Sequence, residues 1–191
     1  MGDFRLGAGH LILSLAGDPW EGNGEKQICE EASHSMSSSL NKITPFLWFD
    51  NNAEAAADFY LSVFPGGRKL DELRATEAGP GPKGSLLIVT IELEGQQVTL
   101  LNGGPSNKLS DAFSFSVRCE NQEEIDKYWA KLTEGGSETA CGWLKDKFGV
   151  SWQIVPKDIT RLVSNPGGMK AMMTMKKLDI AALEKAGAQA K

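Results

Sequence analysis

Histidine is almost absent from this sequence: its two histidines are His10 and His34, and residues 43–191 contain none. A Ser–His–Asp triad or a Cys–His pair needs a histidine to take the proton of the nucleophile. Both kinds of nucleophilic catalysis are therefore excluded from residues 43–191. The same absence removes imidazole, the commonest side-chain ligand of metals, from this part of the chain.

Cysteine is scarce as well, because Cys29, Cys119 and Cys141 are widely spaced and no Cys-x-x-Cys pair occurs. A disulfide framework would need an even number of cysteines at regular spacings. The pattern instead predicts reduced thiols in a cytoplasmic protein. Cys119 falls in the apolar register of an expected strand, so we expect a small core residue there rather than a nucleophile.

Long basic runs and long apolar runs are also missing. The net charge is −5 and the isoelectric point is about 5.1, so we expect no nucleic acid partner and no binding to an anionic membrane surface. No apolar stretch approaches the ~20 residues that a membrane-spanning helix needs. The apolar stretch at residues 10–17 lacks the basic start and the cleavage site of a signal peptide.

Residues 1–42 differ from the rest of the chain, since they are rich in glycine, serine and charge and have no sustained hydrophobic period. We interpret them as a poorly ordered leader, of which residues 1–35 are expected to be dispensable. One domain is expected over residues 43–156, followed by a helical tail over residues 157–191. Four methionines of the tail have helical spacing, which favours packing against the body of the protein or a partner subunit: Met169, Met172, Met173 and Met175.

The pattern of residues 43–66 is repeated at a constant offset of 70 positions. In both copies an alternating strand leads into an amphipathic helix that ends at a pair of glycines. Thr44 of the first copy matches Ser114 of the second, and Asn51 matches Asn121. An internal repeat of this kind predicts the architecture before any catalytic motif is considered.

The ends of the two repeated units align too. Each unit ends with a glycine followed by an expected strand: GQQVTLL in the first unit and GVSWQIV in the second. Aligning these two stretches places Thr99 at the position equivalent to Gln153. We therefore predict an α+β fold of two βαβββ modules, with boundaries at residues 43–102 and 113–156.

The segment GPGPKG at residues 79–84 formally matches the Gly-x-Gly-x-x-Gly pattern of dinucleotide-binding turns. Such a turn follows a strand and opens a helix, whereas this segment precedes the predicted strand at residues 85–95. Its prolines also lack the N–H groups that would bind a phosphate. We interpret it as a loop, and the sequence offers no glycine turn of the kind that binds S-adenosylmethionine.

Two stretches carry a resemblance to a known family: CGWLKDKFGVSWQIVP, which forms the final hairpin, and the tail MKAMMTMKKLDIAALEKA. Together with DFYLSVFPG at the end of the first helix, they resemble the PhnB-like group of the vicinal oxygen chelate superfamily, often labelled "3-demethylubiquinone-9 3-methyltransferase-like". The resemblance covers about residues 43–186. It implies glyoxalase-like half-barrels of curled mixed sheet around a shared cup, C-terminal helices, and a homodimer.

The resemblance also implies where a metal would bind. Enzymes of the superfamily take metal ligands, usually His or Glu, from four strand positions that correspond to Thr44, Thr99, Ser114 and Gln153. Two threonines, a serine and an amide carry no charge and are poor ligands for a divalent transition metal. We therefore expect a cup that holds no metal and no other cofactor.

Strand parity predicts the remaining lining of the cup. Phe46 and Trp48 share a face with Thr44, while Ser116 and Arg118 share one with Ser114. Aromatic walls with a few polar groups are typical of small-molecule pockets. We expect a small, partly apolar or aromatic ligand, whose orientation Gln153 would help to set.

Catalysis is the alternative. Glu92 is the one carboxylate that parity places in the cup, so it is the candidate general base of a lyase or isomerase. Methyl transfer, as the family label implies, is the other enzymatic possibility. A purely structural or solvated role for Arg118 and Glu92 is an equally good interpretation, and parity leaves open whether Trp143 and Lys145 face the cup.

Overall fold

The computed structural model describes residues 40–79 and 81–189. The leader predicted over residues 1–42 therefore lies almost wholly outside the described residues. The first module comprises β1 (Phe46–Phe49), α1 (Ala53–Val63), β2 (Arg68–Arg74), β3 (Leu86–Leu93) and β4 (Gln96–Asn102). The second comprises β5 (Phe115–Cys119), α2 (Gln122–Thr133), β6 (Ser137–Glu138), β7 (Trp143–Lys145) and β8 (Ser151–Pro156). The tail holds α3 (Ile159–Val163), α4 (Pro166–Thr174) and α5 (Ile180–Gln189).

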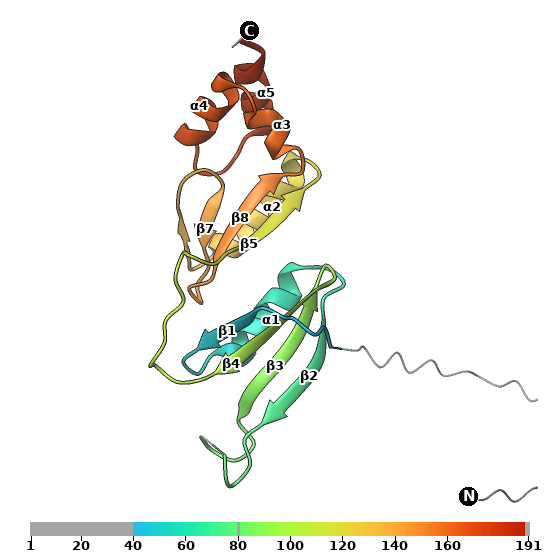
Figure 1. Ribbon diagram of the computed structural model, residues 1–191, viewed down its shortest axis with the longest axis vertical. Helices are drawn as coiled ribbons and strands as arrows, with labels where there is room; N and C mark the ends of the chain where they lie inside the picture. Colours follow the sequence, from blue (N-terminus) through green and yellow to red (C-terminus); the bar gives the residue numbers. More distant parts are fainter. Residues whose placement is uncertain (1–39, 80, 190–191) are drawn as a thin grey trace, which may run out of the picture. The chain divides into compact units, whose positions relative to one another are not determined.

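Each module is one four-stranded mixed sheet with a single helix against one face (Figure 1). The strand orders are β1-β4-β3-β2 and β5-β8-β7-β6, and in each the first strand runs parallel to the last. The predicted α+β fold of paired βαβββ modules is thereby confirmed. Among the described residues, no helix is long and apolar enough to cross a membrane.

The register of the two sheets confirms the repeat. Phe46 lies opposite Thr99 in the first sheet, and Ser116 lies opposite Gln153 in the second. These pairs occupy equivalent places, since Phe46 and Ser116 are separated by the same 70 positions as the rest of the repeat. Thr99 and Gln153 are therefore structural equivalents, as the sequence predicted.

Alternation along the strands buries one face of each sheet beneath its helix. In the first sheet Leu47, Val89 and Leu100 pack under α1, which contributes a run of alanines that lets the helix approach closely. In the second, Cys119 is fully buried, and burial raises the pKa of its thiol to about 12. A thiol so difficult to ionise is inert, so the structure agrees with a core role for Cys119.

A buried carboxylate joins the two modules. Asp146, only 3% exposed, accepts a hydrogen bond from the Tyr60 hydroxyl on α1 at 2.8 Å and from the Trp152 indole N–H at 2.8 Å. Its other oxygen accepts from the backbone N–H groups of Phe148 and Val150 at 2.8 and 3.0 Å. A buried charge is tolerated when hydrogen bonds surround it, and here one donor comes from the first module and three from the second.

The surroundings of Tyr60 keep its hydroxyl protonated, so that it donates a hydrogen bond to Asp146. Burial, followed by the charge of Asp146 and the hydrogen bond to it, raises the pKa of the Tyr60 phenol well above its ordinary value. The phenol therefore remains protonated at physiological pH and holds its hydrogen toward the carboxylate. The contact is a charge-assisted hydrogen bond between residues 86 positions apart.

The tail packs on the second module around Val155, Leu162, Leu178 and Leu183. Its chain is tied to the turn before β7, because the N–H of Cys141 donates to the carbonyl of Met175 at 2.8 Å. The methionines divide between two roles. Met172 and Met175 pack against this small core, whereas Met169 and Met173 are 43% and 63% exposed.

We predict that Tyr60→Phe lowers the free energy of unfolding by about 1–3 kcal/mol, because a buried charged acceptor loses one of its donors. Chemical denaturation of the full chain measures this. Tyr128→Phe is the matched control: Tyr128 is also buried, but its hydroxyl has no hydrogen bond to any residue of the described chain. The control should change stability by no more than about 0.5 kcal/mol. Equal losses in the two variants would contradict a special role for the Tyr60–Asp146 bond.

Candidate functional site

The face of the first sheet that points away from α1 carries the predicted aromatic residues. Phe46 on β1 is 56% exposed, and the Trp48 indole N–H donates to the carbonyl of Gly104 at 2.8 Å. Thr99, opposite Phe46, shares a hydrogen bond of 3.0 Å with the Thr90 hydroxyl on the neighbouring strand. This face combines the aromatic side chains with polar ones, and the hydroxyls of Thr90 and Thr99 are paired to one another.

Two predicted residues of the first module make other contacts. Thr44 lies before the start of β1, and its hydroxyl donates to the carbonyl of Asn41 at 3.2 Å. Glu92 on β3 forms a salt bridge of 3.0 Å with Arg68 on β2. The carboxylate that was the candidate general base is thus engaged in an ion pair with a cation.

The equivalent face of the second sheet is polar. The Gln153 side-chain amide donates to the Ser114 hydroxyl at 2.9 Å, so the structure brings these two predicted residues together. The register places Trp143 and Lys145 on the same face as Gln153, which answers the question that strand parity left open. Arg118 also lies on an exposed part of this face and has no ion pair within the described chain.

These arrangements do not suit a metal. The amide of Gln153 is bonded to Ser114, and the hydroxyl of Thr99 is bonded to Thr90, so neutral donors satisfy one another in each module. A transition metal prefers charged or imidazole ligands that could repay its dehydration. Within residues 40–79 and 81–189, no cluster of three His, Cys, Asp or Glu side chains could hold a metal ion. The residues present at the superfamily's metal positions therefore do not fit a metal centre.

A cavity of about 710 Å³ runs along β5, and we call it the β5 cavity. β5 is an edge strand that pairs only with β8, and every residue from 113 to 118 lines the cavity. The predicted residues Ser114, Ser116 and Arg118 are therefore in its wall, whereas the other predicted site residues are not among those that line it. The remaining lining residues are Pro45, Phe64, Pro65, Leu93, Glu94, Gln96, Val98, Glu124, Lys127, Tyr128 and Trp152.

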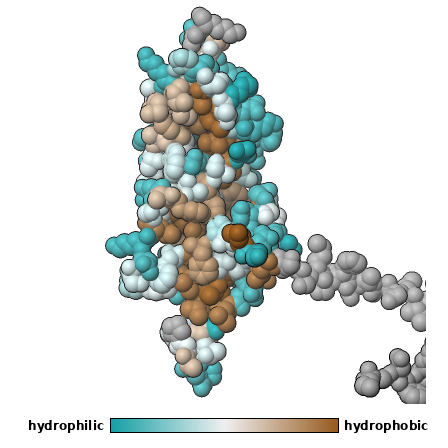
Figure 2. All heavy atoms as spheres, viewed as in Figure 1, coloured by the Kyte–Doolittle hydropathy of each residue, from teal (hydrophilic) through white to brown (hydrophobic). Residues whose placement is uncertain are grey.

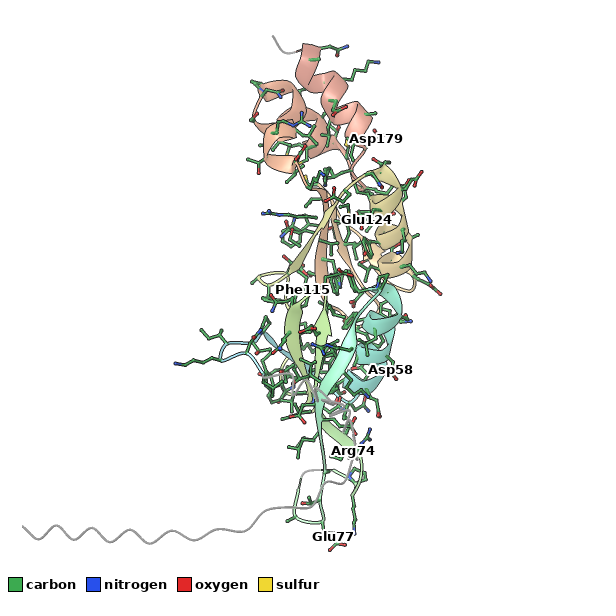
Figure 3. All side chains as sticks on the ribbon, turned by 90° about the vertical axis from the view of Figure 1, so that its right-hand side faces the viewer. Asp58, Arg74, Glu77, Phe115, Glu124 and Asp179 are labelled. Carbon is green, nitrogen blue, oxygen red and sulfur yellow. The ribbon has the colours of Figure 1, made fainter. Side chains whose placement is uncertain are left out.

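Aromatic rings form a continuous series through the wall of the β5 cavity. Tyr128 stacks on Phe64 with ring centroids 5.1 Å apart, and Phe64 stacks on Trp152 at 5.4 Å. The series continues from Trp152 to Phe115 at 4.9 Å and from Phe115 to Phe113 at 5.2 Å. Figure 3 shows Phe115 on β5 and Glu124 on α2, two of the elements that enclose this space.

Tyr128 on α2 is the residue that sequence reasoning missed. Its side chain is only 5% exposed, yet its hydroxyl has no hydrogen bond within the described chain. Every fully enclosed side-chain oxygen and nitrogen of the described residues is hydrogen-bonded, so this hydroxyl is not fully enclosed, and Tyr128 is among the residues that line the cavity. Burial, followed by the charges of Glu124 and Glu94, raises the pKa of Tyr128, which keeps the phenol neutral.

Comparison with known families agrees with this architecture. The profile of the 3-demethylubiquinone-9 3-methyltransferase family matches residues 41–155, which include both modules. The chain belongs to this family. No curated protein matches the sequence.

Two solved structures with the same fold are similar to this chain, and a third similarity is weaker. The PhnB protein of Bacillus cereus is 35% identical over 60% of this chain and 99% of its own length, with a TM-score of 0.56. A protein of Pseudomonas aeruginosa is 22% identical over 62% of this chain and 98% of its own, with a TM-score of 0.51, which shows the fold alone. A glyoxylase/bleomycin resistance protein/dioxygenase domain of Frankia is 14% identical over 62% of this chain and 93% of its own, with a TM-score of 0.42.

The methyltransferase label of the family gains no support from the glycines of this chain. The GPGPKG segment lies in the connection between the antiparallel strands β2 and β3, as the loop interpretation requires, and no helix follows it. In the described chain the strand-to-helix connections are residues 50–52, 120–121 and 157–158, and none contains glycine. The usual glycine turn for the phosphate or carboxylate of a nucleotide-like cofactor is therefore missing from these connections.

We predict that the purified protein, prepared without chelator and without a histidine tag, contains well below one equivalent of Zn, Ni, Fe or Mn. Gln153→Glu, which restores a carboxylate at a superfamily ligand position, should remain equally metal-free, because its neighbours are still neutral hydroxyls. The new charge should also lower stability, since desolvation penalises a half-buried carboxylate. Elemental analysis of both proteins is the measurement, and one bound equivalent in the wild type would contradict the prediction.

Proposed function

We propose that this protein binds a small molecule with an aromatic or apolar body in the β5 cavity. The observation that carries the proposal is the cavity itself: its volume of about 710 Å³ falls within the ~300–1,000 Å³ typical of ligand pockets. Its wall combines five aromatic rings with a few polar groups, which is the usual composition of such a pocket.

Each part of the wall has a separate role in the proposal. The series of rings offers flat apolar surface on which a planar ligand can stack. Ser114 and Ser116 offer hydroxyls, and Arg118 offers a guanidinium that no carboxylate of the described chain engages. As an edge strand, β5 also has backbone N–H and C=O groups without a strand partner, which can bind polar groups of a ligand.

Catalysis by Glu92 is the weaker alternative. Its carboxylate is held by Arg68 and it does not line the β5 cavity. Glu92 would have to lose this ion pair before it could act as a general base. Binding without turnover is therefore the function that these contacts favour, with the protein acting in the cytoplasm, as its isolated cysteines suggest.

We also propose that the protein forms a homodimer. Phe46 and Leu73, both from the first sheet, are 56% and 51% exposed, and Ile43 just before β1 is 88% exposed. Figure 2 shows apolar residues gathered over the strands of this sheet. Apolar side chains grouped in this way are costly to leave in water, and a second copy of the chain would cover them.

We expect Phe113→Ala to weaken ligand retention by about tenfold, because the ring at the open end of the aromatic series is lost. Native mass spectrometry of the protein from its source cells identifies the retained molecule, and titration with that molecule gives the affinity of each variant. Met169→Ala is the control, since Met169 is 43% exposed, as Phe113 is 44% exposed, and it does not line the cavity. An equal loss in both variants would count against the β5 cavity as the binding site.

The homodimer is tested by light scattering at micromolar concentration, where the wild type should have twice the mass of one chain. Phe46→Glu places a charge among the exposed apolar side chains of the first sheet and should give a monomer. Met173→Glu places the same charge on the exposed tail. A monomeric wild type would contradict the proposal, and a dimer disrupted only by Met173→Glu would move the contact to the tail.

A further inference from the structure

The strands of the second sheet place cations and no carboxylate on the face that α2 leaves open. Lys145 on β7 lies directly opposite Ser151 on β8, so their side chains share this face, which also carries Arg118. Within the described strands β5, β7 and β8 there is no Asp or Glu. The one acid of β6, Glu138, points to the α2 side, where it accepts a hydrogen bond of 2.7 Å from the Trp129 indole.

A carboxylate from outside the sheet lies on this face. Asp111 belongs to the connection between β4 and β5, residues 103–114 (Figure 1). Its Oδ1 accepts a hydrogen bond from the Ser151 hydroxyl at 2.7 Å and pairs with the Lys145 ammonium at 2.8 Å. The hydrogen bond from Lys145, followed by that from Ser151, lowers the pKa of the Asp111 carboxyl from its ordinary value. The carboxylate is therefore ionised at neutral pH.

The hydroxyl of Ser151 is a buried donor that depends on an exposed acceptor. Ser151 is only 4% exposed, and Asp111 is the one acceptor of its hydroxyl within the described chain. A buried hydroxyl without an acceptor destabilises a protein. The Asp111 side chain, by contrast, is 66% exposed, and an ion pair so open to water contributes little to stability. The acceptor can thus be replaced easily, whereas the donor needs an acceptor in its place.

Asp111 contacts the sheet as the carboxylate of a bound molecule would. It comes from a connection rather than from a strand of the sheet, and it meets an ammonium and a hydroxyl on two adjacent strands. A charged and a neutral donor converging on one oxygen are a strong contact for a carboxylate. None of Asp111, Lys145 and Ser151 lines the β5 cavity, so these residues form a separate site.

We propose that Lys145 and Ser151 bind the carboxylate of a small ligand, and that Asp111 occupies this site while the ligand is absent. The incoming carboxylate accepts the same two hydrogen bonds and frees the Asp111 side chain. Trp143 lies two positions before Lys145 on the same face, where its ring favours an aromatic body on the ligand. This site does not depend on the function proposed for the β5 cavity.

Benzoate, its neutral analogue benzamide and inorganic phosphate are the probes. Each is titrated into the full-length protein at neutral pH and constant ionic strength. Nuclear magnetic resonance follows the backbone N–H groups of Lys145 and Ser151 and the indole N–H of Trp143. We expect benzoate to bind Asp111→Ala about tenfold more tightly than the wild type, because the competing carboxylate is lost. Benzamide should bind both proteins equally weakly.

Two further variants test the cation, and one is a matched control. In the Asp111→Ala background, Lys145→Gln should remove benzoate binding, whereas Lys145→Arg keeps the charge and should retain it. Glu77→Ala is the control, because Glu77 is an exposed carboxylate that pairs with Lys83 in the loop between β2 and β3. This variant removes the same charge from the protein and should leave the affinity for benzoate at the wild-type level.

The remaining outcomes contradict the proposal. If Asp111→Ala binds benzoate no more tightly than the wild type, or if Glu77→Ala gains as much affinity, Asp111 does not occupy a ligand site. If benzoate binding survives Lys145→Gln, the probe binds elsewhere. If phosphate binds Asp111→Ala and benzoate does not, the carboxylate class is wrong. If none of the probes binds Asp111→Ala at millimolar concentration, the site itself is overturned.

Discussion

The arrangement of the two modules depends on one buried carboxylate. Asp146 lies in the turn between β7 and β8 and receives four hydrogen bonds, one of them from Tyr60 of the other module. A carboxylate removed from water without partners would cost several kcal/mol, so the protein can bury it only while all of these donors stay in place. The carboxylate thus makes the closing of the β7–β8 turn and the docking of α1 mutually dependent.

The same interaction prepares the candidate site. The indole of Trp152 donates to Asp146, which fixes the orientation of the ring that lies in the middle of the aromatic series. Phe64 at the end of α1 stacks on that indole, and Tyr128 stacks on Phe64. A rigid, preorganised wall binds a flat ligand with less loss of side-chain freedom than a mobile one. The wall of the β5 cavity is therefore an extension of the core that Asp146 stabilises.

Three of the four positions that the resemblance equates with metal ligands, Thr99, Ser114 and Gln153, hold neutral side chains with hydrogen-bond partners in their own module. Equivalent strands of the two modules present Phe46 opposite Thr99 in one sheet and Ser116 opposite Gln153 in the other. Thr99 bonds to Thr90 and Gln153 bonds to Ser114, so each polar group has a partner within its own module. These hydrogen bonds hold the side chains in place without a metal.

The sequence by itself determined the two modules, the pairing of Thr99 with Gln153 as equivalents, and the neutral character of the four ligand positions. These follow from strand alternation and from an internal repeat, which are visible in short stretches of chain.

The contributions of Tyr128, Phe64 and Trp152 could not be predicted, because each falls on the face of its element that periodicity assigns to the core. Whether a core-facing tyrosine finds a hydrogen-bond partner or opens onto a cavity depends on residues far away in the sequence, such as Glu94. The direction of Trp143 was undecided for a related reason, since it depends on how β7 pairs with β8 after the turn at Cys141 and Gly142, both at positive φ. Local pattern decides which face a side chain occupies, and only the packing of distant segments decides what that face meets.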